Sequence, residues 1–189
     1  MRKIAIFASG TGSNAKKIIE YFKDHENIKV ALIVTNRADA PVLNLASVYP
    51  VENIVLNRKE FYESSSLLKQ LEQHAIDFIV LAGFLWLIPP YLVTAYNNKM
   101  INIHPALLPK YGGKGMYGMN VHQAVKAANE PETGITIHYV NEKYDEGNII
   151  FQASTTLGPD DSPKDIAKKV QLLEHQHFAP VIENLLMEK

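Results

Sequence analysis

Residues 3–15 have the sequence KIAIFASGTGSNA, which joins an apolar run to a glycine-rich loop. The run at 3–8 has no polar alternation after Lys3, and this is typical of a strand buried on both faces of a parallel sheet. Beyond the loop, Ala15, Ile18, Ile19 and Phe22 recur at helical spacing. A strand, a glycine loop and a helix in this order indicate the first unit of an α/β fold.

Four further apolar runs follow the same pattern, at residues 30–35, 53–56, 78–82 and 100–103. Helical segments are expected between them: Pro41 is a suitable first residue for a second helix, and Phe61, Leu68 and Leu71 form the apolar stripe of a third. This alternation predicts a doubly wound, mostly parallel sheet with helices on both faces.

The C-terminal part has a different pattern. Residues 133–139 alternate polar and apolar, and residues 148–156 follow after a short turn, so the two segments are expected to form an antiparallel pair. Ser162, Pro163 and Asp165 then combine a helix cap, a first-position proline and an acidic third residue. A long C-terminal helix is predicted to start there and run to about Phe178, with Pro180 ending or kinking it.

Length and composition limit the class of protein. At about 150 residues per domain, a chain of 189 residues is expected to form one domain. Apolar residues make up 47% of the chain, cysteine is absent, and 19 basic residues are balanced by 20 acidic ones. No apolar run approaches the length of a membrane span, and the N-terminal run is too short for a signal peptide. We therefore expect a cytoplasmic protein whose partners are small molecules, neither nucleic acid nor membrane.

The glycine loop is the first candidate site. Gly10, Gly12 and Ala15 give the pattern G-x-G-x-x-A, and the following helix offers free N–H groups to an anion. The acidic ribose anchor of dinucleotide-binding folds is absent from its expected place, where residues 34–36 are Val, Thr and Asn. A phosphate cradle is thus favoured over a dinucleotide site. The structural alternative is a tight turn capped by Ser13 or Asn14.

The second candidate site lies in the run at 100–103 and the residue after it. Asn102 and His104 are two positions apart, so both side chains point to one face of a strand. An amide and an imidazole at the carboxyl end of a parallel strand could donate hydrogen bonds to a developing oxyanion. The alternative is a structural histidine that bonds to backbone at the strand end.

Asp145 lies in the turn before residues 148–156. A carboxylate near His104 would raise the pKa of the imidazole and fix its tautomer, although Asp is also an ordinary turn residue. A metal site is not expected. His175 and His177 are two positions apart on a helix and cannot face one ion together, and no H-E-x-x-H motif is present.

Taken together, these motifs resemble those of the glycinamide ribonucleotide formyltransferases, folate-dependent enzymes of purine synthesis. The resemblance covers nearly the whole chain. It is carried by the glycine loop at 9–14, LAGF at 81–84, NIHPALLP at 102–109, DEG at 145–147 and Q-x-x-E-H at 171–175. The combination of NIHP-x-LLP with a downstream D-x-G is specific to enzymes that use formyltetrahydrofolate, whereas the glycine loop alone is not.

The resemblance implies a Rossmann-like formyltransferase fold in a single domain, 1–189, with a nucleotide-phosphate half at 1–100 and a catalytic and folate-binding half at 101–189. It implies transfer of the formyl group of 10-formyltetrahydrofolate to the amine of glycinamide ribonucleotide, by direct attack and without a metal. Asn102 and protonated His104 would stabilise the oxyanion, and Asp145 would keep His104 charged.

The resemblance also implies binding residues. Those for the ribonucleotide phosphate are Gly12, Ser13 and Asn14, and those for the glycinamide end are Gln171 and Glu174. The folate pterin would lie against Leu85, Trp86, Leu87, Ile88, Asn102 and Val140, with Arg58 or Lys59 near the glutamate tail.

Two features depart from the family pattern. Many relatives have Met-Arg where this chain has Leu85 and Trp86. The pterin slot is expected to survive this difference if the folate contacts only the backbone of these two residues. The loop at 110–119 is also about five residues longer than in bacterial relatives, and its glycines suggest a mobile lid.

Other functions remain open from the sequence. Methionyl-tRNA and sugar-nucleotide formyltransferases share the catalytic motifs but are usually longer, and formyltetrahydrofolate hydrolase carries an extra regulatory domain. A nucleotide-binding module without catalysis is a further alternative, against which the presence of Asn102, His104 and Asp145 argues. The sequence does not decide between monomer and homodimer.

Overall fold

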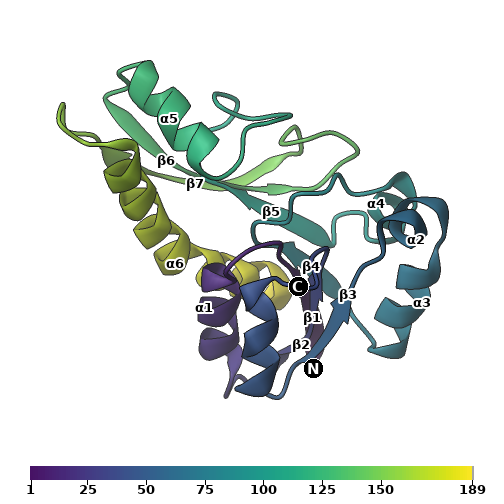
Figure 1. The fold of residues 1–189 in the computed structure, drawn as a ribbon. Coiled ribbons are helices and arrows are strands. Elements are labelled where there is room, and N and C mark those ends of the chain that lie inside the picture. Colours follow the sequence, from purple (N-terminus) through teal and green to yellow (C-terminus); the bar gives the residue numbers. More distant parts are fainter. Residues whose placement is uncertain (189) are drawn as a thin grey trace.

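In the computed structural model, which describes residues 1–188, a single seven-stranded sheet runs through the molecule in the order β3-β2-β1-β4-β5-β6-β7 (Figure 1). The first five strands are parallel, and β6 and β7 are antiparallel to their neighbours. The strands are β1 (Arg2–Phe7), β2 (Ile28–Thr35), β3 (Glu52–Val55), β4 (Phe78–Leu81), β5 (Met100–His104), β6 (Glu132–Tyr139) and β7 (Ile149–Thr156). The doubly wound sheet and its antiparallel C-terminal pair are as predicted.

The helices cover both faces of this sheet. They are α1 (Ser13–Phe22), the 3₁₀ helix η1 (Pro41–Ser47), α2 (Arg58–Glu63), α3 (Ser66–Gln73), α4 (Pro90–Ala95), α5 (Met119–Ala127) and α6 (Pro163–Met187). Figure 1 shows α1 and α6 on one side of the sheet and α2, α3 and α4 on the other. Among residues 1–188, no helix combines the length and apolar composition that a membrane crossing needs.

Alternate residues of β1 pack into two separate cores. Ile4 and Ile6 join the core beneath α1 and α6, whereas Ala5 and Phe7 join the core beneath α2, α3 and α4. Because successive strand side chains point to opposite faces, this division explains why the strand has no polar alternation.

Three helix predictions need correction. The segment that Pro41 opens is a 3₁₀ helix, and the predicted third helix is two short helices separated at residues 64–65. The last helix begins with the predicted Ser162 capping box but continues through Pro180 to Met187. Val181 and Ile182 are buried beyond the proline, so packing against the core compensates for the backbone hydrogen bond that proline cannot donate.

Candidate active site

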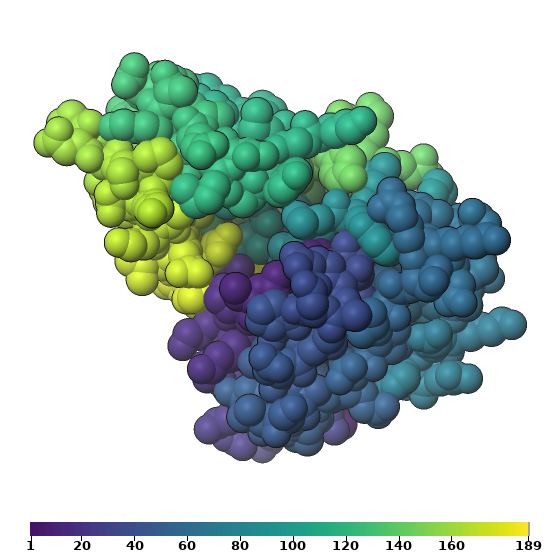
Figure 2. All heavy atoms as spheres, viewed as in Figure 1, coloured from purple at the N-terminus to yellow at the C-terminus, as the bar shows by residue number. Residues whose placement is uncertain are grey.

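A cavity of about 920 Å³ opens at the carboxyl ends of β1, β4 and β5. The strand order reverses between β1 and β4, which is where ligands bind in open α/β sheets. Figure 2 shows the hollow between the green segment above and the purple and blue segments below, with the yellow C-terminal helix at one side. Around it the structure brings together every predicted site residue except Arg58 and its alternative Lys59: Gly12, Ser13, Asn14, Leu85, Trp86, Leu87, Ile88, Asn102, His104, Val140, Asp145, Gln171 and Glu174.

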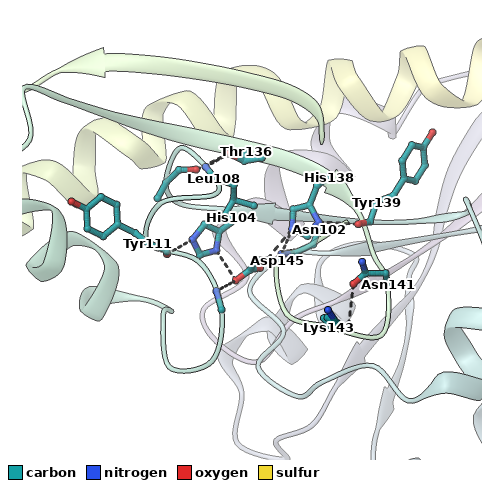
Figure 3. Close-up of polar contacts among 12 residues, drawn as sticks. Asn102, His104, Leu108, Tyr111, Thr136, His138, Tyr139, Asn141, Lys143 and Asp145 are labelled. Carbon is teal, nitrogen blue, oxygen red and sulfur yellow. Dashed lines mark hydrogen bonds and ion pairs between the residues drawn. The ribbon is translucent and has the colours of Figure 1, made fainter. Parts of the chain in front are cut away.

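Asp145 lies between His104 and Asn102, as Figure 3 shows. Its Oδ2 is 3.5 Å from Nδ1 of His104, and its Oδ1 accepts a long hydrogen bond of 3.4 Å from Nδ2 of Asn102. The side chains of His104 and Asp145 are only 4% and 11% exposed, so the pair is shielded from bulk water. Asp145 therefore contacts both residues that the sequence singled out on β5.

Both ring nitrogens of His104 face protein oxygens. Nε2 is 2.8 Å from the backbone carbonyl of Tyr111, so it carries a hydrogen and donates to that carbonyl. The backbone contact proposed as the structural alternative is thus present, but it occupies one nitrogen only. Nδ1, beside Asp145, is the nitrogen left for proton exchange.

His138 completes the cluster, and the sequence reasoning missed it. Its Nδ1 donates to the carbonyl of Tyr139 at 2.9 Å, which leaves Nε2 to accept from Nδ2 of Asn102 at 3.2 Å. The same Nε2 is 3.6 Å from Oδ1 of Asp145. Part of the signal was available, because His138 is a polar residue in the alternating β6 segment. Its position opposite Asn102 comes from the antiparallel pairing with β5, which the sequence did not specify.

Burial acts on the pKa of both members of the pair, but it decides the direction only for His104. Burial lowers the pKa of His104 below its ordinary value, and the opposing effects of the Asp145 charge and the Tyr111 carbonyl do not overcome it. Burial also raises the pKa of Asp145, but the interactions with His138 and His104 and the hydrogen bond from the N–H of Gly113 outweigh it, so this pKa lies below its ordinary value. The Asp145 charge thus raises the pKa of His104 in the predicted direction, but burial outweighs it. That Asp145 keeps His104 protonated during the reaction stays a prediction.

The glycine loop and α6 meet at the other end of the cavity. Nδ2 of Asn14 donates to Oε2 of Glu174 at 2.9 Å, and Nε2 of Gln171 donates to Oγ of Ser13 at 3.3 Å. Neither Ser13 nor Asn14 caps α1, whose N-cap is Gly12 and has no side-chain cap. The capped-turn alternative is therefore wrong, and the first N–H groups of α1 remain available to an anion.

Gly12 is required for two reasons. Its φ of +76° lies in the left-handed region, and a Cβ there would meet Cγ2 of Val42 at 2.5 Å. Packing against η1 therefore demands glycine independently of any ligand. Gly10, by contrast, has open space where its Cβ would lie.

Leu85, Trp86, Leu87 and Ile88 form an apolar wall, with Val140 also lining the cavity. The backbone of this wall is fixed at two points: the N–H of Leu85 donates to Oγ of Ser9 at 3.0 Å, and the carbonyl of Leu87 accepts from the Tyr62 hydroxyl at 3.1 Å. Arg58 does not line the cavity. Its guanidinium lies 5.1 Å from the centre of the Trp86 ring and 5.2 Å from that of the Tyr62 ring.

The glycine-rich loop before α5 also borders the cavity. Lys114, Met116 and Tyr117 line it, and Tyr117 is 53% exposed. Within residues 1–188, no group of three or more His, Asp or Glu side chains is arranged to hold a metal ion.

Comparison with known proteins identifies the class. The formyl transferase family matches residues 2–182, and the chain belongs to this family. Within it, the chain resembles phosphoribosylglycinamide formyltransferases: it is 35% identical to the Bacillus subtilis enzyme, over 98% of this chain and 95% of that protein. Over the whole length of this chain, it is 39% identical to the chloroplastic enzyme of Arabidopsis thaliana, but it spans only 66% of that longer protein. The resemblance stated from the sequence is confirmed.

Solved structures agree with this assignment. The crystal structure of the phosphoribosylglycinamide formyltransferase from Anaplasma phagocytophilum superimposes with a TM-score of 0.91 at 28% identity, covering 100% of this chain and 88% of that chain. The corresponding structure from Bacillus halodurans gives a TM-score of 0.88 at 34% identity, covering 99% and 96%. The predicted formyltransferase fold is confirmed.

Proposed function

We propose that this chain transfers the formyl group of 10-formyltetrahydrofolate to the primary amine of glycinamide ribonucleotide, a step of purine synthesis. One observation carries the proposal: a single cavity is bordered by a glycine loop at the N-terminus of α1, a buried histidine–carboxylate cluster and an apolar wall. A phosphorylated amine and a flat aromatic donor would meet at the cluster between these ends. Both partners are small molecules, and we expect the reaction to occur in the cytoplasm.

The nucleotide would bind at the loop end. Its phosphate would accept hydrogen bonds at the N-terminus of α1, from the loop at Gly12, Ser13 and Asn14. Gln171 and Glu174 on α6 would face its glycinamide part. Burial raises the pKa of Glu174, more than the hydrogen bond from Asn14 lowers it. A substrate amine donating to this carboxylate would add a second hydrogen bond to the one from Asn14.

The folate would bind at the apolar end. The wall of Leu85, Trp86, Leu87 and Ile88 suits a flat ring, and its anchored backbone can offer hydrogen bonds at fixed positions. Val140 and Asn102 would lie against the same ring, and Arg58, which lies 5.1 Å from the centre of the Trp86 ring, would attract the anionic tail. The bound folate supplies the formyl carbon that the amine attacks.

The chemistry is one addition and one elimination. The amine nitrogen bonds to the formyl carbon, and the carbonyl oxygen becomes an oxyanion that accepts hydrogen bonds from Asn102 and from His104 when it is protonated at Nδ1. The contacts of Asn102 are long, at 3.2 and 3.4 Å, so an oxyanion can compete for them. Asp145 takes the proton released by the amine, through water or His104. The carbon–N10 bond then breaks, and the proton passes to N10.

A spectroscopic formyl-transfer assay with a panel of acceptor amines tests the proposal. We expect turnover with glycinamide ribonucleotide and none with charged initiator tRNA or an amino-sugar nucleotide. Turnover with either of the latter and not with glycinamide ribonucleotide would show that the acceptor is assigned wrongly. Binding of the ribonucleotide with no transfer to any acceptor would favour a non-catalytic module.

A further inference from the structure

One short loop segment supplies backbone contacts to both members of the catalytic pair. The carbonyl of Tyr111 accepts from Nε2 of His104 at 2.8 Å, and the N–H of Gly113 donates to Oδ2 of Asp145 at 2.9 Å. This segment lies outside any strand or helix, so no sheet hydrogen bonds fix its position. The orientations of His104 and Asp145 therefore depend on how the segment is held.

The Tyr111 side chain provides that anchor. Its hydroxyl donates to Oε1 of Glu130 at 2.8 Å, and the ring points away from His104, as Figure 3 shows. Glu130 lies two residues before β6, the strand that carries His138. Hydrogen bonds from Lys110 and then from Tyr111 lower the pKa of Glu130, so it is ionised at neutral pH and the bond from Tyr111 is charge-assisted.

Tyr111 needs such an anchor because its backbone is unfavourable. Its φ is +57°, a left-handed conformation that aromatic residues rarely adopt. The next residue, Gly112, has no space for a side chain, because a Cβ there would lie 2.5 Å from the Leu108 side chain and 3.3 Å from that of Asp145. The segment is thus packed against Asp145 in a conformation that it would not take on its own.

We propose that Tyr111 and Glu130 are positioning residues, whose hydrogen bond holds the Tyr111 carbonyl against Nε2 of His104 and thereby assigns proton uptake and release to Nδ1, beside Asp145. The tautomer follows directly. A carbonyl can only accept, so Nε2 keeps its hydrogen and Nδ1 is the nitrogen that gains or loses one. Only the kinetic consequence of this role rests on the proposed function.

The titration of His104 reports on this arrangement. The groups that face the ring are Asp145 from the turn before β7, His138 from β6, His122 from α5 and the Tyr111 carbonyl. Burial and the His138 charge lower the pKa of His104, whereas Asp145 and the carbonyl raise it. Loosening the carbonyl therefore lowers this pKa further, with the other groups unchanged.

The test is Tyr111→Phe in the full chain, which removes one hydroxyl and keeps the ring. We expect kcat to fall roughly three- to tenfold with both KM values within about twofold, since a misplaced catalytic group affects the chemical step. In histidine ¹H–¹⁵N spectra, we expect a lower His104 pKa and partial loss of the Nε2–H tautomer. Glu130→Ala should reproduce these changes, and Glu130→Gln, which keeps an acceptor, should restore most of them.

Lys110→Met is the matched control, because it removes the other partner of Glu130 and leaves the tyrosine contact in place. It should leave both kcat and the His104 spectrum unchanged. The double variant Tyr111→Phe/Glu130→Ala should be no worse than either single one, since both act through one bond. Additive losses, or an unchanged His104 tautomer and pKa in Tyr111→Phe, would overturn the positioning role. The spectra need no substrate, so they decide it even if the acceptor assignment fails.

Discussion

The two ends of the cavity are built differently. At the catalytic end, one residue, Asp145, contacts four others: His104, Asn102, His138 and the backbone of Gly113. At the nucleotide end, Asn14 is paired with Glu174 and Gln171 with Ser13, and Oδ1 of Asn14 is buried without a partner among residues 1–188. A buried acceptor without a partner costs free energy until a donor reaches it. The protein therefore preorganises the proposed catalytic end, whereas we expect a ligand to complete the proposed nucleotide end.

This difference separates what each end contributes to the reaction. Groups held by several protein contacts need no reorganisation when charge develops, so they act on the rate of the chemical step. Groups that gain their partner on binding act mainly on affinity. Substitutions at the two ends are accordingly expected to change different kinetic constants.

The largest effect is expected at the catalytic end, for His104→Ala. This change removes an oxyanion donor and a proton carrier, so kcat should fall by about 10²-fold or more. Nucleotide binding, measured by calorimetry, should stay close to wild type because the loop end is untouched. Unchanged turnover would leave His104 with only its structural bond to Tyr111.

Asp145→Asn should lower turnover by roughly 10- to 100-fold. The Asp145 charge raises the pKa of His104, so its removal lowers that pKa further and makes a protonated ring rarer. Since protonation is lost as pH rises through the pKa, the deficit should be greatest at higher pH. A pH–rate profile with an NMR titration of His104 checks this, and an identical His104 pKa in both proteins would contradict the charge pairing.

At the nucleotide end, Gly12→Ala should destabilise the protein by roughly 1–3 kcal/mol. The cause is the positive φ together with the close contact with Val42. Gly10→Ala is the control: its Cβ meets nothing, and its unfolding free energy should change by less than about 0.5 kcal/mol. Urea melts measure both. Equal stability of the two variants would show that packing against η1 does not fix the loop.

The smallest effect is expected for Glu174→Gln. The amide keeps an acceptor for Asn14 but loses the charge that would attract the substrate amine, so affinity for the ribonucleotide should fall about tenfold. kcat should change less than KM. A larger loss in kcat than in KM would place Glu174 with the preorganised groups and remove the distinction between the two ends.

The residues on β5 show why much of the site could be predicted. Asn102 and His104 are polar side chains two apart in an apolar run, so strand periodicity alone places both on one face. The buried strands and the capped start of α6 follow from equally local rules. The pairing of His138 with Asn102 depends instead on a register between strands far apart in the chain, which no local pattern specifies.

The same distinction explains the errors. α6 continues past Pro180 because the residues after the proline, Val181 and Ile182, are buried in the core. This tertiary packing outweighs the local tendency of proline to end a helix. The lowered pKa of His104 depends on how deeply the ring is buried, and the sequence shows only which residues could neighbour it. The glycine requirement at residue 12 arises from Val42, which lies 30 positions away in the chain.

The hydrogen bond between Asn14 and Glu174 joins residues 160 positions apart. The hydrogen bond from Asn102 to Asp145, by contrast, joins residues only 43 positions apart. Contacts of large sequence separation form only once distant parts of the chain have packed together. If the proposed function holds, we therefore expect the place for the ribonucleotide to depend on the packing of α6 against the glycine loop, whereas the cluster around Asp145 does not include α6.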